Sequence, residues 1–110
     1  MTRYQVIFLL EYLYKFLYLL DDMGYFCLGL ETNSDVEIEE SFKSMRESSI
    51  ALVVGSEALG IRELTRKNCD ITAKIGTAPA SESLNVSNAA ALALFLANRQ
   101  LKLWASNKRT

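Results

Sequence analysis

Apolar residues in this chain gather in short uninterrupted runs, and polar or glycine-containing turns separate the runs. The clearest run is 50–54, which is apolar without alternation, as in a parallel strand that is covered on both faces. Residues 25–30 and 71–75 form two further short apolar runs that predict strands. These three runs predict the core of a parallel sheet.

Residues 5–20 are rich in Leu, Phe and Tyr and predict a first helix, and residues 1–22 form an atypical N-terminal segment around it. Gly24 follows as a suitable left-handed C-terminal cap. Glu11 and Lys15 stand four residues apart within the run, where a helical ion pair forms. Because charges near the middle of a membrane span are costly, we favour a helix covered by other protein over a membrane helix, and expect no membrane partner.

Other segments predict helices between and after the strands. Residues 32–35 have the polar composition of a turn. Residues 36–46 mix acids with apolar residues and suit either an irregular loop or a short amphipathic helix. Residues 61–68 predict a short helix, and 86–104 the last and longest one. Alternating helices and strands indicate an α/β fold over 1–110, a single domain whose parallel sheet has helices on both faces.

The net charge of −1 hides an uneven distribution along the chain. Residues 1–60 carry four bases against ten acids, and residues 61–110 carry eight bases against three acids. The basic half is compatible with a surface that faces nucleic acid, and equally with an ordinary solvated surface.

Histidine is absent from the sequence, and Cys27 and Cys69 are the two cysteines. The lack of histidine excludes Ser-His-Asp and Cys-His nucleophilic catalysis and removes the commonest metal ligand, so we expect no metal site. Two buried reduced thiols in a cytoplasmic protein is the favoured interpretation, with a disulfide as the alternative.

In open α/β sheets ligands bind outside the carboxyl ends of the strands, which places candidate loops after Val54 and after Ile75. Gly55 lets a ligand approach the backbone closely because it has no Cβ. Glu57 is either a charge at the start of a helix or a functional carboxylate. The glycines of 55–60 match neither a P-loop nor a dinucleotide fingerprint.

A second polar cluster precedes the last helix. Ser83 and Asn85 lie just before it, and Ser87 and Asn88 are further capping candidates, which is more than capping alone requires. The helix that follows is apolar on every side, so we expect it to be buried all round, partly against another subunit.

Segments 52–62 and 82–90 together resemble the second and third motifs of the SpoU (TrmH-type) RNA 2′-O-ribose methyltransferases of the SPOUT superfamily. The similarity covers about residues 23–100. It implies the C-terminal half of a SPOUT-type α/β knot, in which the chain is threaded as a trefoil.

The resemblance also implies a site and partners. S-adenosyl-L-methionine would be held at Gly55, Ile75 and Leu84. Polar active-site roles would fall to three side chains: Glu57, Ser83 and Asn85. The reaction would be methyl transfer to a ribose 2′-hydroxyl of rRNA or tRNA, without a metal, in a homodimer packed through the helix at 86–104.

The sequence also departs from the family pattern. The family's first motif leads to a reactive arginine, but the surroundings of Arg3 do not match it, and the strands expected before the first helix are missing. Ala58 replaces a usual glycine, and Gly76 stands where proline is common. We therefore expect a chain truncated at its N-terminus. Alternatives are a catalytically dead remnant that retains cofactor binding, RNA binding or dimerisation, and a small membrane-associated protein.

Overall fold

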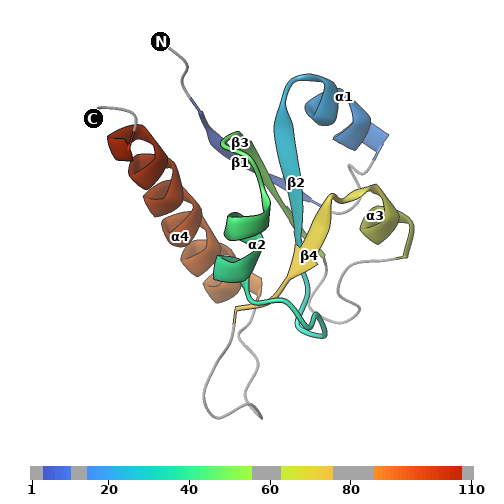
Figure 1. The fold of residues 1–110 in the computed structure, drawn as a ribbon. Helices are drawn as coiled ribbons and strands as arrows, with labels where there is room; N and C mark the ends of the chain where they lie inside the picture. Colours follow the sequence, from blue (N-terminus) through green and yellow to red (C-terminus); the bar gives the residue numbers. More distant parts are fainter. Residues whose placement is uncertain (1–3, 11–14, 56–62, 76–85, 108–110) are drawn as a thin grey trace.

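Strands and helices alternate along the whole chain in the computed structural model, which describes residues 4–10, 15–55, 63–75 and 86–107 (Figure 1). The elements are β1 (Val6–Leu10), α1 (Leu17–Asp22), β2 (Tyr25–Leu30), α2 (Ile38–Ser44), β3 (Ser49–Val54), α3 (Glu63–Asn68), β4 (Ile71–Ala73) and α4 (Val86–Asn107). The predictions of strands at 25–30, 50–54 and 71–75 are therefore confirmed. The segment 36–46 contains a helix rather than an irregular loop.

The four strands form one parallel sheet in the order β1-β3-β2-β4. Strand β3 lies inside the sheet, so Ile50 is level with Val6 of β1 on one side and with Phe26 of β2 on the other. Because β3 has a hydrogen-bonded neighbour on each side and packed side chains on each face, its sequence is apolar without alternation.

Successive residues of β3 belong to two separate hydrophobic clusters, because side chains alternate between the two faces of a strand. Ile50 and Leu52 lie in the cluster that contains residues of α2 and α4. Ala51 and Val53 lie in the cluster that contains Leu17 of α1. Helices α2 and α4 cover one face of the sheet and α1 and α3 lie at the other (Figure 1), which confirms the predicted fold class.

The prediction of a helix over 5–20 is wrong. Residues Val6–Leu10 form strand β1, and the helix in this region is limited to α1. The pairing begins where the amide of Ile50 donates to the carbonyl of Gln5 at 2.8 Å. Partners 44 residues away decide this conformation, and they override the local pattern. The expectation that no strand precedes the first helix is wrong for the same reason.

The end of α1 confirms the predicted cap at Gly24, which has φ of 90° and donates its amide to the carbonyl of Asp21 at 3.0 Å. The expected pair of Glu11 with Lys15 involves a residue outside the described part of the chain. None of the helices in the described residues has the length and apolar character needed to cross a membrane.

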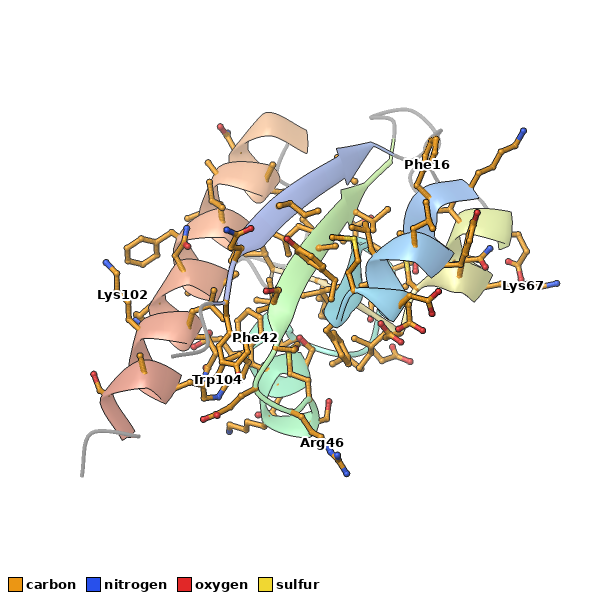
Figure 2. All side chains as sticks on the ribbon, turned by 90° about the horizontal axis from the view of Figure 1, so that it is seen from above. Phe16, Phe42, Arg46, Lys67, Lys102 and Trp104 are labelled. Carbon is orange, nitrogen blue, oxygen red and sulfur yellow. The ribbon has the colours of Figure 1, made fainter. Side chains whose placement is uncertain are left out.

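Helix α4 has two faces of different character, so the expectation that it is buried all round is wrong for the single chain. Ala93, Ala97 and Trp104 face the core, where Trp104 shares a cluster with Phe42 of α2 (Figure 2). The opposite face leaves three large apolar side chains exposed: Leu92, Phe95 and Leu103.

We expect Leu52→Ala to lower the free energy of unfolding by about 2–5 kcal/mol, because it opens a cavity in a fully buried position. Leu19→Ala, at an exposed position of α1, should change it by no more than about 0.5 kcal/mol. Urea denaturation followed by circular dichroism measures both. Equal losses would contradict the assignment of β3 to the core.

Candidate functional site

The carboxyl ends of all four strands lie at one level of the sheet. Leu10 is paired with Val54, and Leu30 with Ala73. Gly29 is paired with Val53, which brings β2 and β3 to the same level. The residues that follow these strands therefore emerge at one edge, where open α/β sheets bind their ligands.

Two of the predicted cofactor-binding residues lie at this edge. Gly55 directly follows β3 and is half-buried. Ile75 lies two residues after β4, is half-buried and packs against the core cluster beneath α2 and α4. Strand β2 separates β3 from β4, so Gly55 and Ile75 are about two strand spacings, roughly 10 Å, apart.

The remaining predicted site residues lie outside the described part of the chain. They are Glu57, Ser83, Leu84 and Asn85. Residues 56–62 and 76–85 lie outside it as a whole, so the knot implied by the resemblance stays a prediction.

The turn after β2 completes the described part of this edge. The amide of Glu31 donates to the carbonyl of Ala73 at 2.9 Å and so continues the pairing of β2 with β4. The hydroxyl of Ser34 donates to the carbonyl of Thr72 at 3.0 Å and accepts from the amide of Val36 at 3.1 Å. This turn was predicted from its polar composition, and its bonds hold it against β4.

A charged cluster that sequence reasoning missed lies beside this turn. Arg66 of α3 forms ion pairs with Glu31 and with Glu63. The hydrogen bond that Arg66 donates to Glu31, followed by the negative charges of Glu31 and Glu63, raises the pKa of Arg66 above its ordinary value. Glu31 and Arg66 are 35 positions apart, so no local pattern could have joined them.

The two thiols lie on the face of the sheet that α1 covers. Cys27 is buried in the cluster with α1, and Cys69 packs against that cluster. Burial, followed by the negative charge of Asp70, raises the pKa of each thiol to about 12. Both are free, as expected, but Cys69 is half-buried and not buried as predicted. At neutral pH both are un-ionised and weak nucleophiles.

Within the described residues no group of three or more Cys, Asp or Glu side chains is placed to hold a metal ion. What the edge offers is a glycine backbone after β3, an apolar side chain after β4 and an arginine–glutamate cluster between them. Fold and edge together define an α/β protein whose candidate ligand site lies at the carboxyl ends of parallel strands.

The chain belongs to the SpoU rRNA methylase family, whose model matches residues 3–95. The match begins well before residue 23, so the resemblance inferred from the sequence was too short at its N-terminal end. The aromatic N-terminal segment, including β1, is part of the matched domain.

Curated relatives include 23S rRNA (guanosine-2′-O-)-methyltransferases named RlmB. The protein from Xylella fastidiosa is 47% identical over 68 residues, which cover 61% of this chain and 27% of that protein. The protein from Ralstonia nicotianae is 38% identical over 81 residues, which cover 74% of this chain and 31% of that protein. The chain thus spans about a third or less of the length of these relatives.

Solved structures give the same assignment. The SpoU methyltransferase AviRb from Streptomyces viridochromogenes, in complex with the cofactor AdoMet, aligns with a TM-score of 0.64 and 26% identity. The alignment covers 81% of this chain and 33% of AviRb. A putative RNA methyltransferase from Bacillus anthracis shares the fold, with a TM-score of 0.60 and 24% identity over 77% of this chain and 54% of that protein.

We expect alkylation of Cys27 and Cys69 by iodoacetamide at pH 8 to be about a thousandfold slower in the folded chain than in guanidinium chloride. The shift of the pKa from 9.0 to about 12 reduces the thiolate fraction by that factor. The rate in the folded chain should rise about tenfold per pH unit, because each unit raises the thiolate fraction tenfold. Mass spectrometry of labelled peptides measures it, and equal rates in both states would contradict burial of the thiols.

Proposed function

We propose that this chain is the S-adenosyl-L-methionine-dependent domain of an RNA ribose 2′-O-methyltransferase that acts on ribosomal RNA. The observation that carries the proposal is the family match over residues 3–95, within which Gly55 and Ile75 emerge at one edge of the sheet. The relatives named as 23S rRNA guanosine methyltransferases support rRNA, and a guanosine, as the substrate.

The described residues fit a nucleoside cofactor. Gly55 offers backbone groups without a side chain in the way, and Ile75 offers an apolar contact against the core. The separation of β3 and β4 by one strand suits a ligand that reaches from one loop to the other. With Leu84 these residues would hold S-adenosylmethionine, which supplies a methyl group made electrophilic by its sulfonium.

The acceptor, a ribose 2′-hydroxyl, is a poor nucleophile, so the protein must align it with the methyl group and help to remove its proton. Alignment removes much of the entropic barrier to such a transfer. A carboxylate or a hydrogen-bonded hydroxyl assists proton removal, which is the role proposed for Glu57 and Ser83, and Asn85 is the third polar residue proposed for the site. We further propose that the protein is cytoplasmic, which accords with its rRNA substrate and its two free thiols.

Calorimetry on the full chain should show binding of S-adenosylmethionine or of its demethylated product. We expect Asn85→Ala to abolish or strongly weaken this binding without lowering the melting temperature. Lys43→Ala, at an exposed position of α2, is the control and should leave both unchanged. No binding heat with the unaltered chain would contradict the proposed function. A large fall in the melting temperature of Asn85→Ala would indicate that Asn85 only caps a helix. Binding without tritium transfer to any rRNA would instead favour a catalytically dead remnant.

We also propose a homodimer that packs through the exposed face of α4. Leu92, Phe95 and Leu103 are 42%, 61% and 49% exposed and share one side of the helix, since they are separated by three and eight residues. An apolar stripe of this kind on a long helix suits a self-complementary contact about a two-fold axis.

We expect Phe95→Glu to shift the chain from dimer to monomer, because it places a charge in the proposed interface. Phe16→Glu, at a comparably exposed aromatic directly before α1, is the control and should leave the dimer intact. Analytical ultracentrifugation over a range of concentrations distinguishes the two. A monomeric unaltered chain, or a dimer lost with Phe16→Glu alone, would contradict the assignment.

A further inference from the structure

Helix α3 is tied to strand β2 at two separate levels. Two residues after the end of α3, the amide of Asp70 donates to the carbonyl of Cys27 at 2.8 Å. A carboxylate oxygen of Asp70 accepts from the amide of Cys27 at 2.7 Å. Within the helix, the guanidinium of Arg66 reaches Glu31 at the carboxyl end of β2. The hydrogen bonds of Asp70 with Cys27 fix the chain just after α3, and the contact of Arg66 with Glu31 fixes the helix itself.

The contact between Arg66 and Glu31 uses both carboxylate oxygens. The Nε of Arg66 donates to Oε2 of Glu31 at 3.2 Å, and Nη2 donates to Oε1. A third nitrogen, Nη1, donates to Oε2 of Glu63 at 2.6 Å. Two parallel bonds fix the relative orientation of the two groups as well as their distance.

The two acids differ in their exposure to solvent. The side chain of Glu31 is 12% exposed and that of Glu63 is 68% exposed. Water and salt screen the outer pair strongly, so it contributes little to holding the helix. The pair of Arg66 with Glu31 is therefore the one that joins α3 to the edge of the sheet.

This edge is where the proposed cofactor site lies. Glu31 directly follows β2, which lies between β3 and β4, so it stands between Gly55 after β3 and Ile75 after β4. Strand β3 is fixed by β1 and β2 on its two sides. Helix α3 is not a member of the sheet, and its position at this edge depends on the bidentate contact of Arg66 with Glu31.

We propose that Glu31 and Arg66 are positioning residues, whose ion pair holds α3 against the end of β2 and thereby keeps the carboxyl edge of the sheet between Gly55 and Ile75 in the arrangement that cofactor binding requires. The effect on cofactor binding rests on the proposed function. The effect on α3 is a property of this chain alone, and the two can be measured separately.

Two other residues of α3 provide matched controls. Lys67 lies next to Arg66 in sequence, but its side chain is exposed and points away from the sheet (Figure 2). Lys67→Gln therefore removes one positive charge from α3 without touching Glu31. Glu63→Gln removes the exposed acid partner of Arg66 and leaves the shielded one in place.

Hydrogen–deuterium exchange of the full chain without ligand tests the first part. Glu31→Gln and Arg66→Gln should each accelerate exchange of the amides at 67–69 by about fivefold or more, while exchange in β3 stays unchanged. Lys67→Gln and Glu63→Gln should leave the rate within about twofold. Unchanged exchange at 67–69 in the first two variants, or equal acceleration in all four, would overturn the inference.

Calorimetric titration with S-adenosylmethionine tests the second part. We expect Glu31→Gln and Arg66→Gln each to weaken cofactor binding by about fivefold or more. The double variant should have the same affinity as the single variant that binds less tightly, since the two residues act through one contact. Equal affinities in the variants and in the unaltered chain would refute a role in cofactor binding. If the unaltered chain binds no cofactor, the proposed function fails, and the exchange rates alone then decide whether Glu31 and Arg66 position α3.

Discussion

The enclosure of strand β3 on four sides is the constraint on which the rest of the structure depends. Its edges are bonded to β1 and β2, and its faces are covered by α1 and by α2 with α4. A parallel strand in this position has no side that tolerates a polar residue, because each backbone group and side chain is removed from water. The run 50–54 satisfies this requirement, and the order of the other elements follows from the need to cover it.

The same enclosure makes the carboxyl edge of the sheet suitable for binding. Polar and charged side chains excluded from β3 appear immediately beyond the strand ends, in the turn that begins at Glu31 and at Lys74, and Gly55 after β3 offers backbone groups alone. Because the pairing of the strands is fixed by buried apolar residues, these groups are held at one level. The rigidity of the sheet thus supplies the positional accuracy that the proposed methyl-transfer site requires.

The sequence pattern predicted the elements whose conformation depends on neighbouring residues, and it failed for those that depend on residues far along the chain. The run at 50–54 and the cap at Gly24 were predictable because their signals lie within a few residues. Strand β1 was mistaken for a helix because its conformation depends on pairing with residues 44 positions away. The apolar runs 50–54 and 71–75 placed Gly55 and Ile75 at the strand ends, and their cofactor role stays a prediction from the family resemblance. The contact of Glu31 with Arg66 has no signal in the sequence around either residue.

The uneven charge along the chain also takes on a different meaning once the chain is folded. Arg66 and Arg99 belong to the basic half of the sequence, and they pair with Glu31 and Glu39 of the acidic half. Folding therefore places part of the positive charge directly beside negative charge, so that the contrast along the chain is reduced in space. At these positions the solvated-surface interpretation accounts for the charge better than contact with RNA does. The proposal of an RNA substrate consequently depends on the family and on the carboxyl edge of the sheet, and the positive charge of residues 61–110 adds little to it.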